Sequence, residues 1–76
     1  MTIISVEAKP VLAIDEYVKV NLVAEEITSF CDDLSNTRIK MKDGEVYLTK
    51  QVVTSELRKA FKGLGATFVN IGGQNV

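Results

Sequence analysis

An Asp-Gly pair at positions 43 and 44, set between two runs of alternating residues, most constrains how this chain can fold. A two-residue turn of type I′ needs positive φ at both central positions, and Asp-Gly is one of the pairs that tolerate this. Such a turn would pair Lys42 with Glu45 and Lys40 with Tyr47. Alternation then places on one face Ile39, Met41, Val46 and Leu48, and on the other Arg38, Lys40, Lys42, Glu45 and Tyr47. The sequence therefore predicts a β-hairpin over residues 38–49.

The remaining chain reads as a series of strands and helices. Apolar residues recur at helical spacing through 50–62, and Gly63 is suited to end that helix in the left-handed conformation. A second helix is predicted over 22–34, where Asn21 is a suitable N-cap and one face would carry Val23, Ile27, Phe30, Cys31 and Leu34. The β-branched residues in this segment leave a strand possible. Strands are predicted at 2–7, 17–21 and 66–71, and residues 72–76 are expected to form a loose tail.

This order of elements predicts one α+β domain over residues 1–76. The last six elements, β-α-β-β-α-β, match the ferredoxin-like arrangement, in which two helices cover one face of a small antiparallel sheet. The strand containing Ile3–Val6 has no place inside such a sheet, so we expect an extra edge strand, which would also tolerate Pro10. Edge strands invite pairing between chains, which predicts self-association through Ile3, Ile4, Val6, Phe68, Val69 and Ile71.

The chain has few means of stabilising a small core. A domain of 76 residues buries only about 60% of the surface of its unfolded chain. Cys31 is the only cysteine and histidine is absent, so we expect neither a disulfide nor a metal site, and no cofactor. Burial against another copy is the remaining means, which predicts a homo-oligomer. The sequence shows neither a secretion signal nor an apolar run of membrane length, so we expect a cytoplasmic protein without a membrane partner.

Charge is divided between the two halves of the chain. Residues 1–36 contain seven acidic and two basic residues, whereas residues 37–76 contain three acidic and seven basic residues. The halves could neutralise each other, or the basic half could bind a partner. Arg38, Lys40 and Lys42 would project from one strand beside Tyr47, which is typical of a ridge that binds phosphate or nucleic acid. Charged residues of this kind also protect edge strands, and the pI near 5.3 argues against a general nucleic-acid binder.

Two other groups of residues suggest chemistry less strongly. Cys31 would lie on the apolar face of the predicted helix, which favours a buried structural thiol over a nucleophile. Along the same helix a polar stripe could hold a hard cation or a basic partner, although a solvated helix face explains it better; it comprises Glu25, Ser29, Asp32 and Asp33.

Two stretches resemble known families. Thr37–Leu48, followed by a helix and by Phe68-Val69-Asn70, resembles the small BON-type α/β module. Ile39–Leu48, with its Asp-Gly turn, resembles the short FlbD-type flagellar-operon proteins. Each resemblance covers half of the chain or less and consists of hairpin features, so no residue role is transferred from either family.

These observations favour binding over catalysis. We expect a small, non-enzymatic, homo-oligomeric interaction module that regulates or inhibits a partner protein through Arg38, Lys40, Lys42 and Tyr47. The alternative is an anion-binding protein that recognises nucleic acid or a small phosphorylated ligand with the same face. An enzyme ranks third, since histidine, the commonest general acid or base, is missing.

Overall fold

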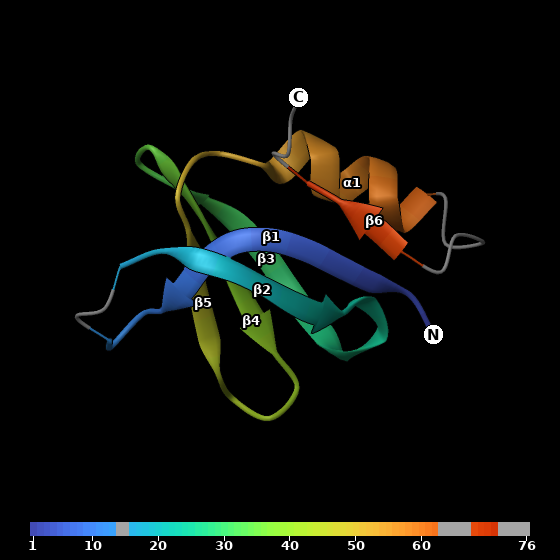
Figure 1. Cartoon of the computed structure of the whole chain (residues 1–76), viewed down its shortest axis with the longest axis horizontal. Helices are drawn as coiled ribbons and strands as arrows, with labels where there is room; N and C mark the ends of the chain where they lie inside the picture. The colour runs from blue at the N-terminus through green and yellow to red at the C-terminus, as the bar shows by residue number, and fades with distance from the viewer. Residues whose placement is uncertain (14–15, 63–67, 72–76) are drawn as a thin grey trace.

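The structure, a computed structural model, describes residues 1–13, 16–62 and 68–71. These residues form six strands, one 3-10 turn and one α-helix (Figure 1). In chain order the elements are β1 (Ile3–Pro10), β2 (Val18–Val23), η1 (Ala24–Glu26), β3 (Ile27–Asp33), β4 (Asn36–Met41), β5 (Val46–Thr49), α1 (Thr54–Lys62) and β6 (Phe68–Asn70). The strands form one sheet of order β2-β1-β5-β4-β3, with β6 beside β1. Within these residues, no helix is long and apolar enough to cross a membrane.

Strand β1 is central, so the prediction of an extra N-terminal edge strand is wrong. One edge of β1 pairs antiparallel with β2 along Ile3–Ala8. The other edge is shared, because β6 runs parallel to Ile3–Ser5 and β5 runs antiparallel to Ala8–Pro10. Every second side chain of this strand is buried in the core, namely Ile4, Val6 and Ala8. Pro10 is tolerated because it is the last residue of the strand.

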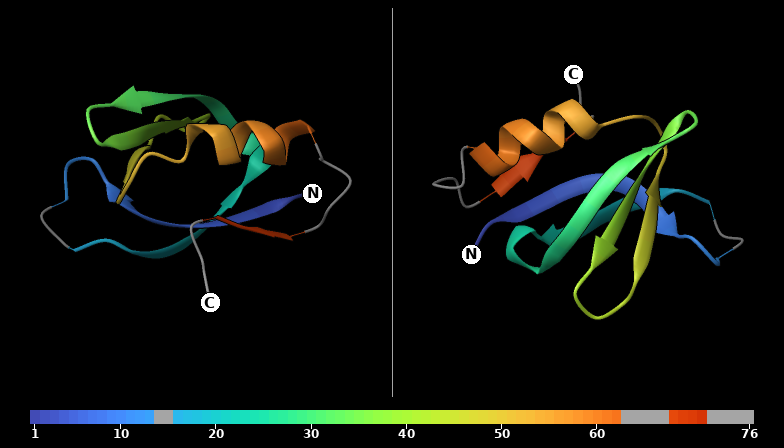
Figure 2. Two further views of the ribbon diagram at one scale, coloured as in Figure 1. Left: turned by 90° about the horizontal axis from the view of Figure 1, so that it is seen from above. Right: turned by 180° about the vertical axis from the view of Figure 1, so that it is seen from behind.

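The helix predicted over 22–34 is absent, and the two-helix ferredoxin-like fold is therefore also wrong. This segment contains the end of β2, the turn η1 and all of β3. The β-branched residues, among them Val23 and Ile27, favour the extended conformation that the structure adopts. Ala24 is buried and donates its N–H to the carbonyl of Thr2 at 2.8 Å, which fixes the bend between the two strands. The sheet curls as a result, because η1 alone joins its two end strands (Figure 2).

The side chain of Glu25 also holds this bend in place. Its Oε1 accepts a hydrogen bond from the N–H of Thr2 at 3.0 Å. This bond lowers the pKa of Glu25 below its ordinary value, because it favours the charged carboxylate. The bond therefore contributes most above the ordinary pKa of a glutamate and is lost as the pH falls through the lowered value.

The hairpin predicted over 38–49 is confirmed, but its register differs by one residue. Ile39 faces Tyr47 and Lys40 faces Val46, because the loop contains three residues rather than two. Met41 closes the loop by donating its N–H to the carbonyl of Glu45 at 2.8 Å. Gly44 has a φ of 93°, as expected for the left-handed residue of a three-residue hairpin loop. This shift moves the side chain of Tyr47 to the opposite face of the sheet.

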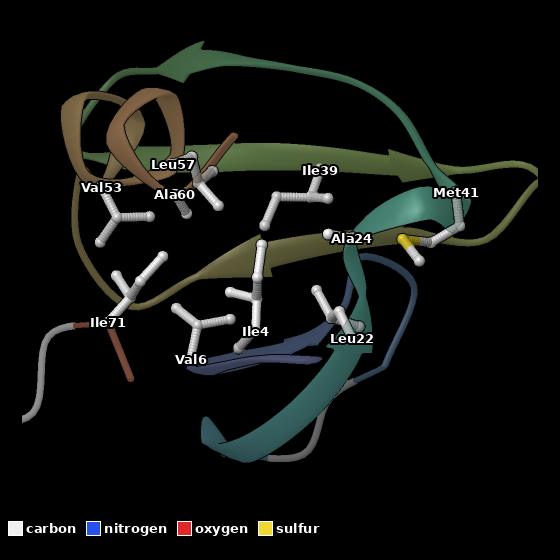
Figure 3. Packing of buried hydrophobic residues seen from close by; sticks show 11 residues of the cluster. Ile4, Val6, Leu22, Ala24, Ile39, Met41, Val53, Leu57, Ala60 and Ile71 are labelled. Carbon is white, nitrogen blue, oxygen red and sulfur yellow. The ribbon is translucent and has the colours of Figure 1, made fainter. Parts of the chain in front are cut away.

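Helix α1 covers the concave face of the curled sheet, here called the inner face. It begins at Thr54, later than the predicted start at residue 50, and its apolar side chains meet those of the strands (Figure 3). The core contains Ile4, Val6, Ala8, Leu22, Ala24, Ile39, Met41, Val53, Leu57, Ala60 and Ile71. The predicted strand at 66–71 is found as β6. The predicted cap at Gly63 and the tail at 72–76 lie outside the described residues.

A buried group of threonines joins α1 to the sheet. The Thr37 hydroxyl on β4 accepts a hydrogen bond from the N–H of Val53 at 2.8 Å and lies 3.2 Å from the hydroxyl of Thr54. The N–H of Thr37 in turn donates to the Thr49 hydroxyl at 2.9 Å. Thr54 also donates its hydroxyl to the carboxylate of Asp32 on β3. Three strands and the start of the helix are therefore linked by hydrogen bonds, and those that Thr37 forms are buried.

Thr37→Val keeps the shape of the side chain and removes its hydroxyl. The buried N–H of Val53 would then lack its acceptor, so we expect the free energy of unfolding to fall by about 1–3 kcal/mol. Urea denaturation measures this change. Thr28→Val makes the same substitution at an exposed position of β3 and should change stability by no more than about 0.5 kcal/mol. Equal losses for the two variants would contradict the proposed role of Thr37.

Leu34 occupies an unfavourable conformation in the turn between β3 and β4. Asp33 and Asn36 pair on either side of this two-residue turn. Leu34 has a φ of 60°, which costs an L-residue about 1–2 kcal/mol. Its side chain is 95% exposed, so burial does not offset the cost.

Leu34→Asn should stabilise the protein by about 1 kcal/mol, because asparagine tolerates the left-handed conformation better than leucine does. Thermal or urea denaturation detects a gain of this size. Leu12→Asn is the matched control, since Leu12 is equally exposed at 96% and has no positive φ. A gain in the control, or none at Leu34, would show that backbone strain is not the cause.

Candidate functional site

The candidate site is built on the convex side of the sheet, here called the outer face. Arg38 and Lys40 alternate with the buried Thr37 and Ile39 along β4, so their side chains point outward and are exposed. The pairing of β4 with β5 places Leu48 opposite Arg38 and Val46 opposite Lys40 on this same face. On the far side of β5, Leu48 faces Lys9 of β1. Two half-buried aliphatic side chains therefore lie between basic residues from two neighbouring strands.

The other two residues predicted for this face lie elsewhere. Tyr47 faces the buried Ile39, so its side chain belongs to the inner face. Lys42 lies in the hairpin loop rather than on β4. Together they line a pocket of about 230 Å³ at the end of the curled sheet, whose other walls are Asn21, Leu22, Val23, Glu26, Met41 and Asp43. Two carboxylates and one ammonium line this pocket, which disfavours binding of an anion.

The outer face contains a cleft between β5 and the segment that follows β1. Its volume is about 300 Å³, and its walls are formed by Pro10, Val11, Leu12, Arg38, Gly44, Glu45 and Val46. The N–H of Val11 donates to the carbonyl of Val46 at 2.9 Å, which holds the two walls together. Leu12 is 96% exposed at the rim. The cleft, here called the outer cleft, is mostly apolar, with one guanidinium and one carboxylate in its lining.

The basic residues of the outer face differ in how they are bonded. Arg38 donates from Nε and Nη2 to Oδ2 of Asp33, at 3.2 and 2.5 Å, and this bond raises the pKa of the guanidinium. Lys9 donates to the carbonyl of Ala13 at 3.2 Å, and its Nζ lies 5.5 Å from the centre of the Tyr17 ring. The side chain of Lys40 forms no ion pair or hydrogen bond with any residue that the structure describes. Its charge is thus available to a ligand beside the outer cleft.

The residues predicted for self-association are divided between core and surface. Ile4, Val6 and Ile71 are buried within the single chain, at 0%, 1% and 3% exposure. Ile3 faces Phe68 across the β1–β6 pair, and Phe68 is 56% exposed while Val69 is half-buried. Self-association through the exposed members of this group stays a prediction.

Two other predictions, for Cys31 and for the polar stripe, depended on a helix over residues 22–34, which the structure does not contain. Cys31 is exposed on the outer face of β3, opposite Arg38, so the expectation of a buried thiol is wrong. The residues of the predicted polar stripe are separated. Glu25 lies on η1, while Asp32 and Asp33 follow each other on a strand and point to opposite faces. Among the described residues, no cluster of three potential metal ligands remains.

Sequence reasoning missed the apolar part of the site. Val46 and Leu48 were assigned to the core face, and the error follows directly from the one-residue shift in register. Leu12 and Tyr17 were not considered, because only the pairing of β1 with β5 brings that part of the chain to the outer face. A short apolar run directly after Pro10, residues 11–14, was the available signal.

Comparison of this chain with protein-family models, with curated proteins and with solved structures finds no match in any of the three.

Proposed function

We propose that this protein is a non-enzymatic interaction module that binds a segment of another protein on its outer face. The segment would place an apolar side chain in the outer cleft and an acidic side chain against Lys40. One observation carries this proposal: a mostly apolar cleft of about 300 Å³ is lined by Val46, which lies opposite Lys40, and the Lys40 side chain forms no hydrogen bond or ion pair with the described residues. Binding to this surface would allow the module to regulate or inhibit its partner.

The composition of the outer face favours a protein over a nucleic acid. Single-stranded nucleic acids bind to grooves of contiguous cations with aromatic side chains on which bases stack. Here aliphatic side chains occupy the centre of the face, and the carboxylates of Asp33 and Glu45 lie among its basic groups. Tyr47, the aromatic residue expected beside Lys40, lies on the inner face. A peptide can satisfy both the cleft and the lysine, whereas a phosphate backbone would meet the two carboxylates.

Selection from a random peptide library displayed on phage tests this proposal. We expect the enriched peptides to combine Leu, Ile, Val or Phe with a neighbouring Asp or Glu. Lys40→Glu should weaken their binding by about tenfold, since it places like charges together. Lys59→Glu is the matched control, because Lys59 is exposed on α1 and the change in charge is the same. Isothermal titration calorimetry with the synthetic peptides measures both variants.

A second variant tests the apolar part of the site. Leu12→Ser should also weaken peptide binding, and its full exposure means that the fold does not depend on it. Enriched peptides without acidic residues, or binding that is unaffected by both variants, would contradict the proposal. Salt-dependent binding of a single-stranded oligonucleotide that survives Leu12→Ser would support the anion-binding alternative instead.

A further inference from the structure

Strand β3 has a free edge, with which no described strand pairs, and some of its backbone hydrogen-bonding groups are directed outward there. The N–H groups of Thr37 and Met41 on β4 both bond toward β5, so those of Arg38 and Lys40 point toward β3. Arg38 and Lys40 pair with Cys31 and Ser29, which therefore use their backbone groups within the sheet. The alternate residues Phe30 and Asp32 direct their N–H and C=O groups away from β4. These four groups form no hydrogen bond with any described residue.

The free edge is symmetric about Cys31. A β-bulge between Ile27 and Ser29 interrupts the strand on one side, and the turn after Asp33 ends it on the other. The regular part is therefore 29–33, with Cys31 at its centre and the outward groups of Phe30 and Asp32 on either side. A two-fold axis through Cys31 would pair each Phe30 with Asp32 of a second copy. All four outward groups of each chain would then be hydrogen-bonded.

We propose that two copies of this chain form a dimer by antiparallel pairing of their β3 strands about Cys31. A two-fold dimer of this kind is closed, because the same edge is used on both copies. An axis through Phe30 would be less favourable, since it would pair Asp32 with Thr28, which lies at the bulge. This inference is independent of the proposed docking of a partner protein.

The side chains along β3 are compatible with this pairing. Asp33 would face Ser29 and Asp32 would face Phe30, so no two carboxylates would lie directly opposite each other. The ring of Phe30 stacks on that of Phe61 with centroids 5.6 Å apart, and both side chains are only half-buried in the single chain. The two Phe30 rings would be diagonal neighbours, a separation that aromatic side chains can span. Pairing would therefore cover apolar surface that α1 leaves exposed.

Strand β2, at the other end of the sheet, is better protected than β3 against pairing with another chain. Strand β2 carries Lys19 as its second residue, and a lysine on an edge strand opposes pairing with another chain. In β3 the charged residues are confined to one end, Asp32 and Asp33, and Asp33 is neutralised by Arg38 at 2.5 Å. Of these two edges, β3 is the one suited to a second copy.

The experiment uses the native cysteine as a probe of register. Cys31 of each copy would face Cys31 of the other in a non-hydrogen-bonded pair, where Cα atoms lie about 4.5 Å apart and a disulfide is possible. Added oxidised glutathione should therefore link the two chains: the two thiols lose two electrons and two protons, and one glutathione disulfide is reduced to two glutathione thiols. A non-reducing gel should show a band at twice the 8.4 kDa chain mass. Cys31→Ser combined with Ser35→Cys moves the thiol to the exposed turn, and this control should not be linked at a comparable rate.

Sedimentation equilibrium in reducing buffer measures the dimer without the disulfide. We expect the wild type and Cys31→Ser to dimerise alike. Cys31→Glu should raise the dimer dissociation constant by about fivefold or more, because it places two like charges opposite each other. The monomer should remain folded, since the new carboxylate would face Arg38, and circular dichroism verifies this. Ser35→Glu adds the same charge in the exposed turn and should leave the dissociation constant unchanged.

Three outcomes would overturn the proposal. The first is a wild-type protein that stays monomeric across the concentration series. The second is a dimer that Cys31→Glu leaves intact and Phe68→Ser abolishes, which would place the interface at β6. The third is a dimer whose native cysteines are linked no faster than the cysteine in the exposed turn.

Discussion

The fold depends on strand β1, which is hydrogen-bonded along both of its edges. It joins the two parts of the sheet, because β2, β5 and β6 all pair with it, and β2 and β6 pair with no other described strand. Along its shared edge, β6 pairs with the start of β1 and β5 pairs with its end. The buried side chains of Ile4 and Val6 point from β1 into the core, on the side where Ile39 and Leu57 lie (Figure 3). A chain of 76 residues without disulfides obtains its core in this way, by curling one sheet around one strand.

The curl explains why the two faces of the sheet have different roles. The inner face is concave, and α1 is enough to cover it (Figure 2). Leu57 of this helix is fully buried. The outer face is convex, and no described element covers it. Apolar residues such as Val46 and Leu48 are therefore left half-buried beside Arg38 and Lys40. The outer face therefore combines aliphatic and basic side chains, because the core is closed by covering only the inner face of the sheet.

The sequence predicts well those features that depend on neighbouring residues. The hairpin, the helix before residue 62 and the strand near the C-terminus all follow from local alternation, helical spacing and turn chemistry. The segment 22–34 was assigned wrongly, because five apolar residues happen to fall at helical spacing while the bend at η1 depends on Thr2, far away in sequence. The position of β1 could not be predicted either, since it depends on long-range pairing alone.

The candidate site shows the same division between local and distant information. Arg38 and Lys40 were placed on one face correctly, because strand alternation is a local property. Tyr47 was misplaced by one residue of register, since Asp43-Gly44 fits both a two-residue and a three-residue loop. The apolar wall at Leu12 reaches the site only through the pairing of β1 with β5.

The two proposals concern adjacent parts of one sheet, and this adjacency has a structural consequence. Strand β3 neighbours β4, so a dimer formed at β3 would join the outer faces of two copies into one continuous surface. The dimer would then present two copies of Lys40 and of the outer cleft, one from each chain, related by the two-fold axis at Cys31. A partner with two copies of the recognised segment could bind both at once, and its affinity would exceed that for a single site without any new contact. The free edge and the uncovered face would thus act together, because both result from a sheet that closes its core on one side only.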